Sequence, residues 1–153
     1  MIKVLFVCLG NICRSPMAEA IFRHKVEQVG LEKEIFVDSA ATSSWHIDAP
    51  PHKGTLAILK DYRISSKGLK GRQLQKEDFE AFDYIVAMDE SNIKDIYRIL
   101  GQPQHPKIFR LLDLTEDAKD VPDPYYTGNF QETYDLVSAG CEALMKKIKE
   151  ERR

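Results

Sequence analysis

Short apolar runs alternate along the chain with segments in which apolar residues recur every three or four positions. The runs are rich in β-branched and aromatic residues, which is typical of strands, and the spaced segments are typical of helices. Four runs predict strands: 2–7, 35–37, 82–88 and 107–112. Four segments predict helices: 17–29, 53–62, 89–99 and a last one from 129 nearly to the end. The chain therefore alternates strand and helix four times.

This alternation predicts an α/β fold, because a helix between two strands returns the chain so that the strands run parallel. We expect a single domain over residues 1–153, with a four-stranded parallel sheet and helices on both faces, doubly wound and flavodoxin-like. Such sheets bind ligands beyond the carboxyl ends of their strands. Cys8, Ser39 and Asp89 each follow a predicted strand, so we expect them at one edge of the sheet.

Cap residues frame the first predicted helix. Ser15 is expected to be its N-cap, Pro16 its first residue, and Gly30 its stop. Only a short loop then connects the first strand to this helix. It begins with Cys8 at the end of the strand and leads to Arg14 at the start of the helix.

Composition narrows the classes of partner and compartment. A net charge of −2 over 153 residues gives no general attraction to nucleic acid or to an anionic membrane, so we expect neither partner. The first apolar run is too short for a signal peptide or a membrane span. Three cysteines do not form a disulfide framework, which favours a cytoplasmic location. The four histidines lack metal-ligand spacing, and we expect no metal and no cofactor.

The loop from Cys8 to Arg14 carries the candidate chemistry. Free N–H groups at a helix start, with Gly10 allowing a tight turn, can hold a tetrahedral anion, and the Arg14 guanidinium can bind two of its oxygens. The same positive field favours the thiolate of Cys8. The pattern therefore predicts in-line attack of Cys8 on phosphorus and a cysteinyl-phosphate intermediate, without a metal ion.

Less specific interpretations stay open for both cysteines of the loop. Free cysteines at strand ends are often inert and buried, which is the alternative for Cys8. Cys13 is either a packing residue without a chemical role or the partner of Cys8 in a reversible, protective disulfide.

The run from Val7 to Pro16 resembles the signature loop of the low-molecular-weight protein tyrosine phosphatases. The resemblance extends in order over nearly the whole chain, through five further stretches: 38–41, Trp45, 82–85, 88–92 and 123–126. It implies a phosphatase domain that hydrolyses phosphotyrosine-containing proteins and small aryl phosphates, with inorganic phosphate as a competing ligand. It also implies Cys8, Arg14 and Asp123 as catalytic residues.

Asp123 is also the best candidate for a general acid on local grounds. Pro124 holds it extended and Pro122 stiffens the other side, although an Asp-Pro pair by itself is more often an ordinary turn. The resemblance implies that Asp123 protonates the leaving phenolate and then deprotonates the attacking water.

The expected substrate-binding residues are Leu9, Gly10, Asn11, Ile12, Cys13, Ser15, Trp45, Tyr125 and Tyr126. By resemblance, the two tyrosines form an aromatic wall for the phenyl ring, with Trp45 on the opposing loop. Leu9 and Ile12 are expected to line the floor.

The other polar residues of this region are expected to support the loop. Ser15 is expected to donate its hydroxyl to the thiolate, and Asn11 to brace the loop with Ser39 as its implied partner. Asp89 is expected to cap a helix and to hold Arg14. Some family members add a histidine to this bracing network, shortly before an Arg-Gln pair, but the run 67–73 that ends in Arg72 and Gln73 contains no histidine.

Three alternative functions fit the sequence less well. A protein arginine phosphatase on the same scaffold tends to carry Thr where Ile12 stands and to lack the tyrosine pair. An arsenate reductase needs a relay of further cysteines, and only Cys141, on the apolar face of the last helix, lies outside the loop. A non-catalytic phosphate-binding module does not require Cys8, Arg14 and Asp123 together.

Overall fold

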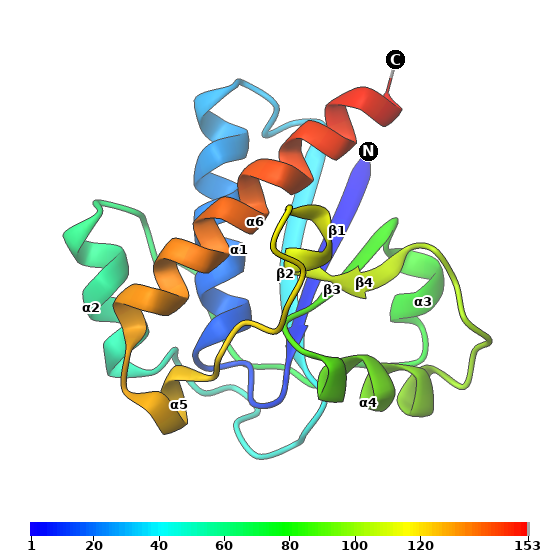
Figure 1. Ribbon diagram of the computed structural model, residues 1–153, viewed down its shortest axis with the longest axis horizontal. Coiled ribbons are helices and arrows are strands. Elements are labelled where there is room, and N and C mark those ends of the chain that lie inside the picture. Colours follow the sequence, from blue (N-terminus) through cyan, green and yellow to red (C-terminus); the bar gives the residue numbers. More distant parts are fainter. Residues whose placement is uncertain (153) are drawn as a thin grey trace.

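The computed structural model describes residues 1–152 and contains a four-stranded parallel sheet with the strand order β2-β1-β3-β4 (Figure 1). Its strands are β1 (Ile2–Cys8), β2 (Ile35–Ala41), β3 (Tyr84–Ala87) and β4 (Ile108–Arg110). The helices are α1 (Arg14–Gln28), α2 (Lys53–Asp61), α3 (Asp78–Ala81), α4 (Glu90–Leu100), the 3₁₀ helix η1 (Leu111–Leu114), α5 (Pro124–Thr127) and α6 (Phe130–Glu151). The predicted doubly wound α/β fold is confirmed.

Two apolar cores lie on the two faces of the sheet. Val4 and Phe6 of β1 pack into the core formed with α1, α2 and α6, whereas Leu5 and Val7 pack into the core formed with α4. All four side chains have no exposed surface. Burial on both faces explains why β1 is an almost continuous apolar run, as is typical of a central parallel strand.

The carboxyl ends of β1 and β3 form the point at which the sheet changes its winding direction. β1 pairs with β2 on one side and with β3 on the other. Cys8 is the last residue of β1, and Asp89 lies two positions beyond the end of β3. Both therefore lie at the crevice in which doubly wound sheets bind ligands.

Strand β2 is longer than the predicted run 35–37 and includes Ser39, which was expected to follow the strand. The polar residues Asp38 and Ser39 had indicated a loop. They stay in the strand because Asp38 binds Arg72 and Ser39 binds Asn11. Pairing of β2 with β1 continues as far as Ala41.

The start of the first helix also differs from the prediction. α1 begins at Arg14 rather than Met17, and its N-cap is Cys13, which makes no side-chain cap bond. Ser15 is therefore not the N-cap, because its hydroxyl is used by Cys8 and Asn11 instead. The predicted stop at Gly30 is confirmed, since this glycine follows the C-cap with a φ of 73°.

The later elements follow the prediction more closely. Asp89 caps α4 in a reciprocal bond pair with Asn92, and Gly101 ends the helix in the left-handed conformation. The strand predicted over 107–112 stops at Arg110, because Leu111 and Leu112 turn into η1 and are buried there. Within residues 1–152, no helix has both the length and the apolar character that crossing a bilayer requires.

Candidate active site

The Cys8 thiol lies at the centre of a curled loop between β1 and α1. Its Sγ accepts a hydrogen bond from the Asn11 backbone N–H at 3.3 Å and lies 3.0 Å from the Ser15 hydroxyl. The Asn11 side-chain amide already donates to Ser15 Oγ at 2.7 Å. The hydrogen of the Ser15 hydroxyl is thereby left available for the sulfur, which is the direction that the sequence predicts.

Asn11 holds the loop in shape through its side chain. Its backbone has a φ of 56°, the left-handed region that asparagine tolerates better than most residues. Its Oδ1 accepts from the Arg72 backbone N–H at 3.1 Å, and its Nδ2 donates to Ser39 Oγ at 2.9 Å. The Ser39 contact expected from the resemblance is present, and Arg72 supplies a further contact to Asn11.

The loop also offers donors for an anion. Within residues 1–152, the backbone N–H groups of Gly10, Ile12 and Cys13 donate to no acceptor of the protein. They lie immediately before the first turn of α1, where the helix dipole adds positive potential. These groups remain available for the oxygens of a phosphate.

Arg14 is buried beneath this loop and oriented by fixed partners. Its Nη1 donates to Asp89 Oδ2 at 2.6 Å and to the Val121 carbonyl at 2.9 Å, and its Nη2 lies 3.5 Å from Asp123 Oδ2. Burial alone would lower the pKa of the guanidinium. The negative charges of Cys8 and Asp89 outweigh this effect and raise the pKa, so that Arg14 stays charged. The expected contact of Arg14 with Asp89 is present.

Asp123 reaches the same place from a segment more than a hundred residues downstream. Its backbone is extended, with φ −83° and ψ 112°, as Pro124 predicted. Its Oδ1 accepts from the Tyr125 N–H at 3.1 Å and thereby caps α5. This short helix was not predicted, and its cap hydrogen bond fixes the position of the carboxyl group.

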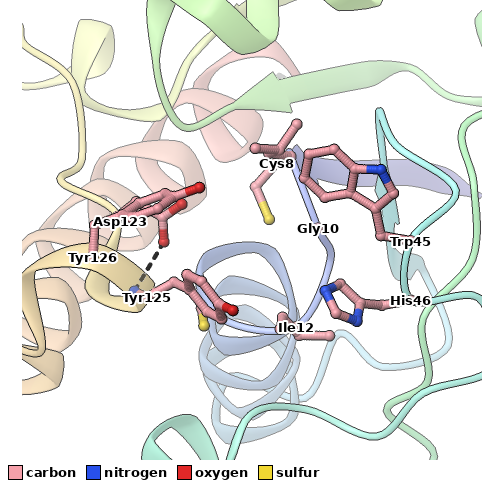
Figure 2. A pocket seen from close by; sticks show the side chains of 10 residues that line it. Cys8, Gly10, Ile12, Trp45, His46, Asp123, Tyr125 and Tyr126 are labelled. Atoms are coloured by element: carbon pink, nitrogen blue, oxygen red, sulfur yellow. Dashed lines mark hydrogen bonds between the residues drawn. The ribbon is translucent and has the colours of Figure 1, made fainter.

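A cleft of about 550 Å³, measured out to its open mouth, lies above the loop. Asp123, Tyr125 and Tyr126 line one side, and Trp45 and His46 line the other, with the Cys8 sulfur between the two sides (Figure 2). Leu9, Gly10, Ile12 and Cys13 complete the lining. The other three predicted residues, Asn11, Arg14 and Ser15, do not line the cleft but contact its lining residues.

The aromatic side chains are more exposed than packing residues would be. The exposed fraction is 67% for Trp45, 58% for Tyr125 and 73% for Tyr126. The rings of the two tyrosines lie edge to face, 5.3 Å apart. Surface that no core covers at the mouth of a cleft is available to bind a ligand.

Two residues of the site were missed from the sequence. His46 borders the cleft beside Trp45, and its ring lies so close to Gly10 that a Cβ there would come within 3.3 Å of Cδ2. Glu19 is buried behind the loop and accepts a hydrogen bond from Ser39. A histidine without metal-ligand spacing gave no signal, and Glu19 in the sequence indicated only a favourable charge near the start of a helix.

All three cysteines are free thiols. Burial raises the pKa of Cys13 to about 12, helped by the negative charges of Asp123 and Cys8, so this thiol resists ionisation. A disulfide between Cys8 and Cys13 stays a prediction. Cys141 is fully buried on α6, and its Sγ faces the Ala18 carbonyl of α1.

Comparison with known proteins gives consistent results. The family model of the low molecular weight phosphotyrosine protein phosphatases matches residues 3–153. The low molecular weight protein-tyrosine-phosphatase YfkJ of Bacillus subtilis is 52% identical over 155 residues, which cover 100% of this chain and 99% of YfkJ. PtpA of Staphylococcus epidermidis, of the same description, is 44% identical over 97% of this chain and 94% of its own length.

Solved structures extend the likeness to three dimensions. The crystal structure of YfkJ matches with a TM-score of 0.97 and covers 100% of this chain and 98% of that one. A Drosophila arginine phosphatase matches with a TM-score of 0.86 at 34% identity, over 97% of this chain and 98% of that one. The family match over nearly the whole length agrees with the curled loop around Cys8. The chain belongs to the low molecular weight phosphotyrosine protein phosphatase family.

Proposed function

We propose that this protein hydrolyses phosphotyrosine in proteins, and small aryl phosphates, through a cysteinyl-phosphate formed on Cys8. One observation carries the proposal: the Cys8 sulfur lies in a cleft between the side that Asp123 and the two tyrosines line and the side that Trp45 lines, within a loop of free N–H groups. A nucleophile, an acid and an anion site are thereby combined in one place.

The first half of the reaction transfers the phosphoryl group. The Cys8 thiolate attacks phosphorus in line, and the bond between phosphorus and the tyrosine oxygen breaks. Asp123 gives its proton to that oxygen, so that a neutral tyrosine leaves. Arg14 and the free N–H groups stabilise the charge on the three equatorial oxygens.

The second half restores the enzyme. The Asp123 carboxylate takes a proton from a water molecule, which attacks phosphorus and releases inorganic phosphate. The bond between sulfur and phosphorus breaks, and Cys8 leaves as a thiolate. The Ser15 hydroxyl, 3.0 Å from the sulfur, stabilises that thiolate.

The walls of the cleft favour aryl over alkyl phosphates. The rings of Trp45, Tyr125 and Tyr126 can each contact a flat phenyl ring, which is worth on the order of 1 kcal/mol per aromatic pair. A phosphoserine side chain is too short to reach these rings while its phosphate is bound at the loop. Inorganic phosphate binds the same donors and is expected to compete.

Two alternatives are less well supported. The arginine phosphatase alternative requires a small polar pocket, whereas the apolar Ile12 and two tyrosines line this cleft. The reductase alternative requires an accessible third cysteine, whereas Cys141 has no exposed surface. Burial also raises the pKa of Cys141, which further disfavours its thiolate.

We also propose a single phosphatase domain over residues 1–153 that works in the cytoplasm, because a reducing compartment preserves the Cys8 thiolate. With a net charge of −2, neither nucleic acid nor a membrane surface is a proposed partner.

The test compares turnover of matched peptides that carry phosphotyrosine, phosphoserine or phosphoarginine, together with a small aryl phosphate. We expect the wild type to hydrolyse the phosphotyrosine peptide and the aryl phosphate. This activity should persist in the presence of a metal chelator and disappear in Cys8→Ser. Faster turnover of phosphoarginine would identify the arginine phosphatase instead. Turnover by Cys8→Ser would refute the mechanism, and so would the loss of wild-type turnover in the presence of the chelator.

A further inference from the structure

A histidine outside the cleft connects the active-site loop to the aromatic wall. His52 is the N-cap of α2 and is partly buried. Its backbone N–H donates to the Ile12 carbonyl at 2.7 Å, and its ring lies edge to face with the Tyr125 ring, with 6.1 Å between the centroids. Ile12 and Tyr125 both border the cleft (Figure 2). His52 therefore contacts the loop and the wall together, although it does not line the cleft itself.

The His52 ring is held from two sides. Its Nδ1 accepts a hydrogen bond from the Gly54 backbone N–H at 3.0 Å. The Phe130 ring, at the start of α6, stacks on it at 5.1 Å with an angle of 22° between the planes. Phe130 in turn lies directly against Gly54, where a Cβ would come within 2.4 Å of the phenyl ring. These contacts from α2 and α6 fix the orientation of the imidazole.

The Tyr125 ring depends on such a fixed neighbour. It is 58% exposed, and the rings of Tyr126 and His52 both lie edge to face with it. Tyr126 is itself 73% exposed and offers little support, so the firmer contact is the one with His52. An exposed side chain loses rotamer freedom when it binds a ligand, and a contact that fixes the side chain beforehand lowers that cost.

We propose that His52 is a positioning residue for aryl substrates, which acts by holding the Tyr125 ring in place beside the loop. Its effect is confined to ligands that carry a ring, because the phosphate group binds to the free N–H groups of the loop and to Arg14. This inference rests on the proposed function, since it concerns the phenyl ring of the proposed substrate.

The test measures the dissociation constants of benzylphosphonate and of inorganic phosphate by calorimetry, at one pH, for the wild type and His52→Asn. Asn is a preferred N-cap, so α2 keeps its start while the imidazole is removed. We expect the dissociation constant of benzylphosphonate to rise by roughly fivefold, the effect of one aromatic contact. The dissociation constant of inorganic phosphate, which has no ring, should stay unchanged.

His105→Asn is the matched control. The Nδ1 of His105 likewise accepts from the backbone N–H two residues later, that of Lys107, and its ring lies edge to face with the Phe79 ring at 5.5 Å. The control variant therefore loses the same kind of ring contact. His105 is exposed, and its partner Phe79 belongs to α3, which lies away from α5 (Figure 1). Neither dissociation constant should change in this variant.

A double-mutant cycle tests whether His52 acts through Tyr125. In the Tyr125→Ala background, replacing His52 should no longer weaken the binding of benzylphosphonate, because the ring that His52 holds is gone. An undiminished effect in that background would refute the positioning role. A merely structural role, in which the loss of His52 disturbs the loop at Ile12, would weaken the binding of phosphate and benzylphosphonate alike.

The outcomes separate this inference from the proposed function. If the wild type does not hydrolyse aryl phosphates, the proposed function fails, whatever the two dissociation constants are. If the wild type hydrolyses them and His52→Asn changes both constants equally or changes neither, only the role of His52 is refuted. Should His52→Asn not fold, Phe130→Leu removes the ring on which His52 stacks and keeps an apolar side chain. It should weaken the binding of benzylphosphonate alone, and the absence of this difference would refute the proposal.

Discussion

The Arg14 guanidinium donates a 2.6 Å hydrogen bond to Asp89 although 75 residues separate the two in sequence. Asp89 uses its other oxygen, Oδ1, to accept from the Asn92 N–H at 2.8 Å and so caps α4. One carboxyl group thereby fixes the start of a helix on one face of the sheet and the Arg14 side chain at the start of a helix on the other. The crevice between β1 and β3 is held together at this point.

Replacing Asp89 by Asn tests that link. Asn is an equally good N-cap, so α4 should remain stable, but the charge that orients Arg14 is lost. We expect kcat/KM for an aryl phosphate to fall by roughly tenfold, the loss of one charge-assisted hydrogen bond. The inhibition constant of inorganic phosphate should rise in parallel.

Asp95→Asn is the matched control for this change. Asp95 lies on the same helix and pairs with Arg98 at the surface, where ion pairs contribute little. Its kinetics should equal those of the wild type. Wild-type kinetics in Asp89→Asn would show that the Val121 carbonyl and Asp123 suffice to orient Arg14.

Cys8→Ser should separate binding from chemistry. Oxygen replaces sulfur with little change in shape, so the donors of the loop stay in place while the nucleophile becomes far weaker. We expect turnover to disappear and phosphate binding, measured by calorimetry, to persist within a few-fold of the wild type. Loss of phosphate binding as well would mean that the thiol also shapes the loop.

Asp123→Asn should reveal the general acid through the leaving group. The amide oxygen can still accept from the Tyr125 N–H, so α5 keeps its cap. We expect kcat/KM to fall by about 10² to 10⁴ for phenols that are poor leaving groups, and by much less for nitrophenol. The plot of log kcat/KM against leaving-group pKa should therefore become steeper.

Asp117→Asn is the control for the loss of a negative charge in the segment before Asp123. Asp117 is exposed and pairs with Lys119. An equal loss across all phenols in Asp123→Asn would contradict the role of proton donor.

Glu19 should make the protein less stable as pH rises. Its pKa is about 7 in the folded state against 4.5 when unfolded, so the folded state binds the proton more tightly. The free energy of unfolding should therefore fall between about pH 4.5 and pH 7, by up to roughly 3 kcal/mol. Urea unfolding of Glu19→Gln should lack this part of the pH dependence. A constant stability difference between the two proteins from pH 5 to pH 8 would argue against it.

Gly140 should be essential for the packing of α6. A Cβ at this position would come within 2.4 Å of Leu111 Cγ in η1. We expect Gly140→Ala to lower the free energy of unfolding by about 1–3 kcal/mol, the usual cost of overpacking, even though Ala favours the helix. The loss should be smaller when Leu111 is also replaced by Ala. Equal losses in the two backgrounds would show that the loss does not come from the contact with Leu111.

The fold was predictable because the buried strands are continuous apolar runs in the sequence. The apolar run of β1 and the Asp89 and Gly101 boundaries of α4 carry local signals that tertiary contacts do not override. The errors lie where polar residues take tertiary partners. Ser15 indicated an N-cap but bonds to Cys8 and Asn11, and the polar Asp38 indicated a loop but pairs with Arg72 inside β2.

Part of the site was also predictable, because its signals are local in the sequence. Cys8 and Arg14 lie in one loop of sequence, so their spacing and the following helix suggest an anion site without knowledge of the fold. Nothing local shows that Glu19 is buried, or that His46 turns toward Gly10. These contacts depend on how α1, β2 and the loop after β2 pack, which one sequence does not encode in any short pattern.

The left-handed backbone of Asn11 has a consequence for how quickly the enzyme engages its substrate. This conformation costs about 1 kcal/mol for a non-glycine residue, and contacts from Arg72, Ser39 and Ser15 hold it in place. Contacts within the protein therefore hold the loop in its curved conformation. The entropy cost of ordering the loop falls on folding and not on the binding of an anion. Phosphate analogues should bind in a single kinetic phase whose rate rises linearly with their concentration, without a slow rearrangement.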